Sequence, residues 1–202
     1  MAGKGAKVIQ IREVEFANKY HVPVRVLSSF EPGSGTLISL EEKDMENGLV
    51  SGIAFQKDQM KYTLHGVSDT PGIAYSILGP LSDANIEVDV IVQNISVDGK
   101  TDFTFTVSKE DEHATSEVIK QMKNSLDFDD VIIDSQIAKV SLVGVGMRTH
   151  AGIASTAFKA LSENDVNIQM ISTSEIKITI VINEGAVTKA VKALHEAFKL
   201  EK

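Results

Sequence analysis

Two short segments carry the residue types that could bind a small charged molecule. They read Ser68-Asp69-Thr70-Pro71-Gly72-Ile73-Ala74 and Thr149-His150-Ala151-Gly152-Ile153-Ala154. Each precedes a stretch with apolar residues at helical spacing, so amide groups at the start of a helix would face a carboxylate. The glycine in each would let a ligand approach the backbone. An ordinary capped helix, with Asp69 or Thr70 as the cap and Pro71 in the first turn, is the alternative interpretation.

Other polar residues are candidates for the same ligand. Asp69 or Asp89 is available for an ammonium group, and Gln93 for further hydrogen bonds. Gln93-Asn94 and Thr173-Ser174-Glu175 interrupt otherwise apolar strands at matching depth, and buried polar groups require partners. Solvated strand ends remain the alternative for these two groups. The pattern predicts a binder of a small zwitterion, although the second turn lacks both Asp and Pro and need not bind equally well.

The sequence contains no motif typical of catalysis. The five histidines show neither an HExxH motif nor a metal-ligand spacing, and no cysteine is present to complete a zinc site. The glycine pairs at 3–5 and 33–35 match neither GxxxxGK[ST] nor GxGxxG, so no phosphate cradle is predicted. The acidic runs at 41–44 and 110–112 are typical of solvated surface. We therefore expect no active site and no bound metal.

Both turns belong to a duplicated segment. Residues 66–95 and 146–175 align at a constant offset of 80, and their matching residues include Gly66/Gly146, Gly72/Gly152, Leu81/Leu161 and Ile91/Ile171. Fixed-period similarity of this kind indicates two copies of one structural unit. With 202 residues and 43% hydrophobic content, the chain is long enough for two small cores.

The first copy predicts an α+β unit. Its pattern gives strands, helices and a hairpin turn in the order strand 60–67, helix 71–83, strand 86–95, turn 97–100, strand 101–107, helix 111–125 and strand 131–134. This βαββαβ order places two helices on one face of a four-stranded antiparallel sheet, the ferredoxin-like arrangement.

The second copy lacks a fourth strand. It begins with a strand at 138–146 and continues with helix 152–163, strands 166–172 and 176–182, and helix 185–198. An unpaired apolar run at 48–55 precedes the first copy, and pairing it into the second sheet avoids an open edge. We therefore predict that the first unit (60–135) is inserted into the second (48–56 plus 139–202).

Residues 1–40 belong to neither copy. Val8, Ile11 and Val14 lie on one face of a predicted helix, and two strand-like segments follow. One helix and two strands bury little surface alone. We interpret this segment as the end of a larger domain, joined to the repeats by a charged linker at 41–47.

Charge and composition limit the partners. The formal net charge is -8, and nucleic acid is disfavoured because phosphate binding needs clustered Lys and Arg. No stretch approaches the roughly 20 apolar residues of a membrane span. Glu13 and Glu15 interrupt the apolar core that a signal peptide requires, and the absence of cysteine is compatible with a reducing compartment. These features predict a cytoplasmic protein.

Several segments together carry a family resemblance. Residues 5–38 (GAKVIQIREVEFANKYHVPVRVLSSFEPGSGTLI) resemble the C-terminal end of the amino-acid kinase domain of aspartokinases. The motifs VSDTPGIA, VQNIS, KVSLVGVGM and ISTSEIKI are similar to the tandem ACT domains that follow it. The resemblance covers nearly the whole chain, and it fits either a natural regulatory β subunit or a regulatory fragment.

The resemblance implies that lysine, threonine or both bind between ACT units. The first effector site would use Asp69, Thr70, Pro71, Gly72, Ile73, Ala74, Asp89 and Gln93, closed by Asn167 and Ile168 of the other unit. The second would use His150, Gly152, Ile153, Ala154, Ser174 and Glu175, with residues near Asp89 and Ser96. Asp165 departs from the asparagine frequent in close relatives.

The resemblance also sets expectations about activity and assembly. The aspartate- and ATP-binding motifs have no counterpart here, so the chain alone should be inactive and bind no cofactor, with ATP and Mg²⁺ confined to the absent kinase domain. We expect a homodimer through the ACT units, and a full-length catalytic aspartokinase is a candidate partner. A free-standing ACT-type metabolite sensor or assembly protein is the alternative, but it would have no need for residues 1–40.

Overall fold

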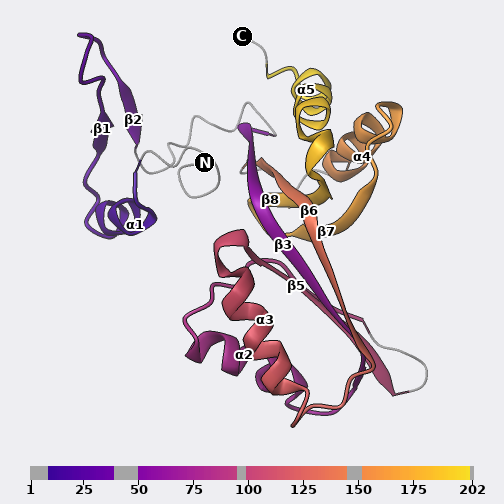
Figure 1. Ribbon diagram of the computed structural model, residues 1–202. Helices are drawn as coiled ribbons and strands as arrows, with labels where there is room; N and C mark the ends of the chain where they lie inside the picture. The colour runs from indigo at the N-terminus through magenta and orange to yellow at the C-terminus, as the bar shows by residue number, and fades with distance from the viewer. Residues whose placement is uncertain (1–8, 39–49, 95–98, 145–151, 201–202) are drawn as a thin grey trace. The chain divides into compact units, whose positions relative to one another are not determined.

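The computed structural model describes residues 9–38, 50–94, 99–144 and 152–200 (Figure 1). The chain divides into two compact units. Unit 1 comprises Met1–Gln56, Val140–Ile180 and Thr188–Lys202, and unit 2 comprises Lys57–Lys139 and Val181–Val187. Six strands form one sheet in the order β4-β5-β3-β6-β8-β7, and its two longest strands, β3 and β6, contribute to both units. The predicted α+β class with two similar units is confirmed.

The N-terminal segment of unit 1 holds one helix and a hairpin. Helix α1 spans Ile11–Lys19, and strands β1 (Val24–Val26) and β2 (Thr36–Ile38) pair antiparallel. The rings of Phe16 and Tyr20 lie 4.8 Å apart, one helical turn from each other, yet both side chains are more than half exposed. The order of elements is the predicted one, and the exposed rings agree with the expectation that this segment buries little surface by itself.

Strand β3 is longer than the sequence predicts. It runs without a break over Gly52–Ser68, whereas separate strands at 48–55 and 60–67 were expected. The polar residues 57–59 mimic a loop in the sequence. In the structure Asp58 takes a positive φ of 56°, and the side-chain amide of Gln59 donates to the carbonyls of Lys57 and Asp58. The polar groups are thus satisfied locally and the strand continues.

Unit 2 packs two helices on one face of its strands. Helices α2 (Ile73–Asp83) and α3 (Glu112–Met122) lie on the same side of β3, β4 (Ile91–Gln93), β5 (Lys100–Ser108) and the first part of β6 (Asp130–Val143) (Figure 1). The buried core draws on alternate strand positions and on one face of each helix: Met60, Tyr62, Leu64, Phe103, Phe105, Ile73, Ile77, Leu81, Ile119 and Met122. The apolar residues at every second strand position and those on one face of each helix, with its period of 3.6 residues, therefore pack into one apolar layer.

Tyr62 is the largest polar side chain in that core. Its ring stacks on Phe105 at 5.6 Å, and its hydroxyl donates toward the Glu112 carbonyl at 3.3 Å. Burial raises the pKa of the Tyr62 phenol, and the hydrogen bond with Ser116 partly offsets that effect. The phenol therefore stays neutral and hydrogen-bonded under ordinary conditions, as a buried tyrosine requires.

Strand β4 is shorter than predicted. A strand at 86–95 was expected, but only Ile91–Gln93 is a regular strand. The Thr106 hydroxyl accepts a hydrogen bond from the Val90 amide at 3.1 Å, while the Thr106 backbone pairs with Asp89 and Val90. The side chain thus substitutes for part of the ladder just before the regular strand begins.

The second copy has the same order of elements. Helix α4 (Ile153–Glu163), strands β7 (Ile168–Thr173) and β8 (Lys177–Asn183) and helix α5 (Val187–Ala197) agree with prediction to within two residues at each end. Strand β6 is continuous over Asp130–Val143, although a strand ending at 134 was expected. Apolar side chains of both helices are buried, and Ser141 and Thr179 share a buried hydrogen bond of 2.9 Å.

The predicted domain boundaries differ in detail from the compact units. The prediction assigned 48–56 with 139–202 to one unit and 60–135 to the other, and it treated 1–40 as a separate remnant. The Ser51 amide donates to the Val143 carbonyl at 2.7 Å, and both residues belong to unit 1. Val181–Val187 group with unit 2 instead. In the described part of the chain, no helix has the length and apolar character needed to cross a membrane.

Candidate functional site

Both turns are built around a glycine with a left-handed backbone. Gly72 precedes α2 with φ 94°, and Gly152 precedes α4 with φ 108°. Each glycine carbonyl accepts the amide of the residue four positions on, Ser76 at 3.0 Å and Thr156 at 2.8 Å. A serine hydroxyl also donates to each carbonyl. Because other residues rarely adopt such φ values, glycine is required at both positions.

Asp69 and Thr70 do not cap α2, so the interpretation of this turn as an ordinary capped helix was wrong. The N-cap residue is Gly72, and within the described part of the chain no side chain bonds to the first amides of the helix. Backbone groups hold the turn instead: the Asp69 amide donates to the Gly99 carbonyl at 2.8 Å, and the Ile73 amide donates to the Thr70 carbonyl at 3.1 Å. Pro71 lies before the helix instead of in its first turn.

This arrangement leaves the start of α2 suited to an anion. An α-helix cannot satisfy its first amides internally, and here no side chain replaces the missing acceptor. The amides of Ala74 and Tyr75 in the first turn therefore point toward a position that a carboxylate could occupy. Gly72 has nothing within 4 Å of the position a Cβ would take, so the approach to these amides is open.

The structure does not bring Asp89 to this turn. Ser68, just before the turn, pairs with Lys100 at the start of β5, whereas the Asp89 amide bonds to Thr106 six residues further along the same strand. Six strand residues correspond to roughly 20 Å. Within the first copy Asp69 and Asp89 therefore lie at different levels of the sheet, and their joint part in one effector site stays a prediction. Gln93 lies between these levels, paired with Phe103.

Asp89 has an internal partner that the sequence analysis missed. The Lys139 ammonium lies 2.6 Å from Asp89 Oδ2, and only 3% of the Lys139 side chain is exposed. A buried lysine requires such a counter-charge. The signal was present in the sequence, because Lys139 interrupts the apolar run of β6. Asn167 and Ile168 belong to unit 1, at the start of β7, so their part in the first site stays a prediction.

The second candidate site is described only in part. His150 and Ser96 lie outside the described residues. Gly152 is exposed at the start of α4, followed by Ile153 and Ala154. Ser174 and Glu175 lie in the turn between β7 and β8, where the Ser174 amide donates to the Lys177 carbonyl at 2.8 Å.

That β7–β8 turn lies beside the strand that leads toward α4. The Gly144 amide, at the end of β6, donates to the carbonyl of Ile176 at 3.0 Å. Ser174 and Glu175 are therefore at the end of the sheet from which the chain leaves toward Gly152. The part of Ser174 and Glu175 in the second site stays a prediction.

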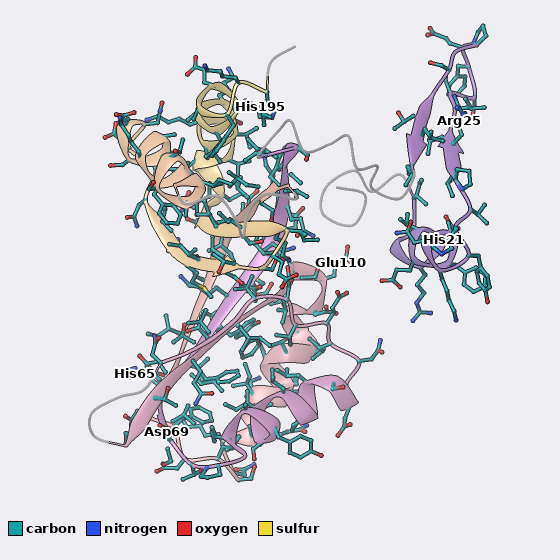
Figure 2. All side chains as sticks on the ribbon, turned by 180° about the vertical axis from the view of Figure 1, so that it is seen from behind. His21, Arg25, His65, Asp69, Glu110 and His195 are labelled. Carbon is teal, nitrogen blue, oxygen red and sulfur yellow. The ribbon has the colours of Figure 1, made fainter. Side chains whose placement is uncertain are left out.

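A group of charged residues beside the first turn was also missed. We call His65, Gly66, Lys100, Asp102 and Asp129 the bulge cluster. Asp102 Oδ1 accepts from His65 Nδ1 at 2.6 Å and from the Gly66 amide at 3.1 Å. Lys100 Nζ donates to Asp129 Oδ1 at 2.6 Å, and the Asp129 amide donates to the His65 carbonyl. Figure 2 shows His65 and Asp69 near the same end of unit 2.

The ion pair between Lys100 and Asp129 in this cluster shifts the pKa of both side chains. The hydrogen bond from Lys100 lowers the pKa of the Asp129 carboxyl, and the same bond raises the pKa of the Lys100 ammonium. Both side chains are about half exposed, so solvent screens the pair. The spacing of these residues in the sequence gave no signal, because they come together only when β3, β5 and the segment before β6 are folded.

A separate apolar hollow lies on the N-terminal segment. It has a volume of about 570 Å³ and is lined by Arg12, Glu13, Phe16, Ala17, Tyr20 and Val22. None of the predicted site residues takes part in it.

Comparisons with known proteins place this geometry in a family. Two ACT-domain family models match, at residues 63–127 and 140–198. The aspartate kinase of Pseudomonas fluorescens strain SBW25 is 56% identical over 202 residues, which are 100% of this chain and 49% of that protein. A crystal structure of aspartokinase alpha and beta subunits is 47% identical, covers 74% of this chain and 99% of that one, and superposes with a TM-score of 0.70. The chain belongs to the aspartokinase family.

The similarity extends to a regulatory subunit of the family. The regulatory subunit of aspartate kinase from Thermus thermophilus, in its ligand-free form, is 32% identical, with 74% of this chain and 99% of that one covered and a TM-score of 0.71. The described fold is therefore that of aspartokinase regulatory ACT domains. The chain spans about half the length of the curated aspartokinases it matches.

Proposed function

We propose that this chain is the amino-acid-binding regulatory region of an aspartate kinase, and that lysine, threonine or both bind it and cause feedback inhibition of the first step of aspartate-family amino-acid biosynthesis. The observation that carries the proposal is the duplicated turn: each ACT copy presents a left-handed glycine at the start of a helix, and no side chain of the described residues caps the first amides of that helix. Such a site takes the carboxylate of an amino acid.

The first copy adds an anion to this turn. Asp69 is exposed, and no hydrogen bond from its side chain caps α2. Its carboxylate is therefore available for the ammonium group of a small amino acid such as threonine. Ser174 and Glu175 give the second copy a different set of polar groups, which suits lysine better than threonine. Escherichia coli aspartokinase III, at 24% identity a guide to fold alone, has been solved with lysine and aspartate.

The N-terminal segment favours this proposal over a free-standing metabolite sensor. The 56% identity to an aspartate kinase runs over the whole chain, including α1 and the β1–β2 hairpin. A free sensor would not need these elements. We propose that ATP, Mg²⁺ and catalysis belong to a kinase domain, that the regulatory region acts in the cytoplasm as a homodimer, and that a catalytic aspartokinase chain is its functional partner.

Calorimetric titration of the chain with threonine and with lysine tests the proposal. We expect saturable binding of at least one of them and no ADP production from ATP and aspartate. Asp69→Ala should weaken threonine binding about tenfold, because a charge-assisted hydrogen bond contributes roughly 1.5 to 3 kcal/mol. Its unfolding midpoint should not change, since Asp69 does not cap the helix. Ser174→Ala should affect mainly lysine. Absence of binding for both amino acids would contradict the proposal.

A further inference from the structure

The bulge cluster lies where β3 turns toward the first candidate site. Leu64 pairs with Phe103 and Val67 with Thr101, so three steps on β3 oppose two on β5. The extra residue is a β-bulge, and Gly66 in it has a φ of 66°. Bulges bend a strand and redirect the residues that follow. The path of residues 68–72 is thus fixed at His65 and Gly66.

Asp102 holds this bulge from the neighbouring strand. Its carboxylate accepts both the His65 ring nitrogen at 2.6 Å and the Gly66 amide at 3.1 Å. After the bulge, Ser68 pairs with Lys100 and the Asp69 amide bonds to Gly99. One side chain therefore links the bulge to the strand that also anchors the turn.

The sequence of the second copy has other residues at the positions of His65 and Asp102. Strands β5 and β8 align at an offset of 75, because Ser108 and Asn183 end them and each accepts the amide two residues on at the start of a short 3-10 helix. At this offset Lys177 takes the place of Asp102. His65 corresponds to Val145, at the offset of 80 that relates the first strands of the two copies. The acceptor and its histidine partner are therefore specific to the first copy.

We propose that Asp102 is a positioning residue for the first effector turn, holding the bulge at His65 and Gly66 so that Ser68–Gly72 leaves β3 in the geometry that receives the amino acid. This rests on the proposed function. The His65 and Asp102 side chains are 55% and 43% exposed, so the hydrogen bond between them contributes little to global stability. Its loss should act on the geometry of the turn, and so on ligand affinity, more than on folding.

Three variants of the full chain test this role. Asp102→Ala removes the acceptor, and Asp102→Asn keeps an oxygen for the Gly66 amide. Asp134→Ala is the matched control, because Asp134 pairs with Lys61 at 3.4 Å in the same unit but on a different strand. The measurements are calorimetric titration with threonine and with lysine, the urea unfolding midpoint, and hydrogen exchange of the Gly66 and Asp69 amides.

For Asp102→Ala we expect threonine binding about tenfold weaker, a nearly unchanged unfolding midpoint, and faster exchange at Gly66 and Asp69. Asp102→Asn should recover most of the affinity, and Asp134→Ala should behave like the wild type. Unchanged exchange at Asp69 in Asp102→Ala, or equal effects of Asp102→Ala and Asp134→Ala, would overturn the inference. If the wild type binds neither amino acid, the proposed function fails, and the exchange of the two amides alone decides whether Asp102 positions the turn.

Discussion

The two copies share a backbone but differ in the side chains around it. Both helices span 11 residues after a left-handed glycine. Both end with a second positive φ, 58° at Asn85 and 48° at Asp165, and in each the amide of that residue bonds to a serine carbonyl three positions earlier. Asp165, noted as a departure from relatives, therefore fills the position where Asn also tolerates a left-handed backbone.

The differences are concentrated in charged residues. The first copy has Asp69, Asp89 and Asp102 where the second has Thr149, Gln169 and Lys177. The repeat thus preserves the geometry that presents helix amides and varies the groups that would meet the rest of a ligand. This comparison teaches that backbone geometry and selectivity are set by separate residues, and the predictions below test that separation.

Removing the Lys139 side chain should have the largest effect on the free energy of unfolding. Lys139→Ala would leave Asp89 without its ammonium partner in a mostly buried setting. We expect a loss of about 2 to 4 kcal/mol in the free energy of unfolding, measured by urea denaturation. Lys120→Ala is the control, because its pair with Glu117 is exposed and should contribute little to the free energy of unfolding. Equal effects of the two changes would mean that the Asp89 pair is not a structural element of the first copy.

Gly66→Ala should have the second-largest effect on the free energy of unfolding. A Cβ at Gly66 would clash with Asp129 Oδ2, and the Asp129 side chain could rotate away only by leaving Lys100. The φ of 66° alone already disfavours alanine, and we expect it to cost about 1 to 2 kcal/mol in unfolding free energy.

Gly33→Ala is the control for this substitution. Gly33 lies between β1 and β2, and nothing is within 4 Å of the position a Cβ would take there. Alanine at this position should be nearly neutral. A Gly66→Ala protein as stable as the wild type would show that the bulge is not fixed as described.

The pH dependence of the bulge cluster should be the smallest effect. The Lys100 bond lowers the pKa of Asp129 below its ordinary value of 3.8. Its stabilisation is therefore present above that value and is lost as pH falls through the lower folded-state pKa. Between pH 7 and pH 3 the wild type should lose slightly more stability than Asp129→Asn, as followed by urea denaturation at both pH values. The same loss in both proteins would show that the ion pair between Lys100 and Asp129 does not contribute to stability.

The sequence predicted best what depends on local pattern. The duplicated glycines located both turns, and the apolar spacing placed α2, α4 and α5 within two residues of their ends. It failed where distant segments decide the outcome. Polar residues 57–59 suggested a loop, but Gln59 pairs with Ser108 on the distant strand β5, and β3 continues through this stretch.

The candidate site shows the same limit. Asp69 was predicted to cap α2, because Asp is a frequent N-cap, but the left-handed Gly72 moved the start of the helix beyond its reach. Asp89 was grouped with the turn because its carboxylate could meet an ammonium group and because the family resemblance implies it in the first effector site. Only the register of β3, β4 and β5 shows that Asp89 lies at another level and pairs with Lys139.

The measurement that tests the central claim most directly is a pair of titrations with threonine and lysine, on Gly72→Ala and on Gly152→Ala. A Cβ would have open space at Gly72 and only a 3.9 Å contact with Ser155 at Gly152, so both changes act mainly through the positive φ. We predict that Gly72→Ala weakens mainly threonine binding and Gly152→Ala mainly lysine binding, with similar losses of stability. Wild-type affinity for both amino acids in both variants would contradict the assignment of the effector sites to these two turns.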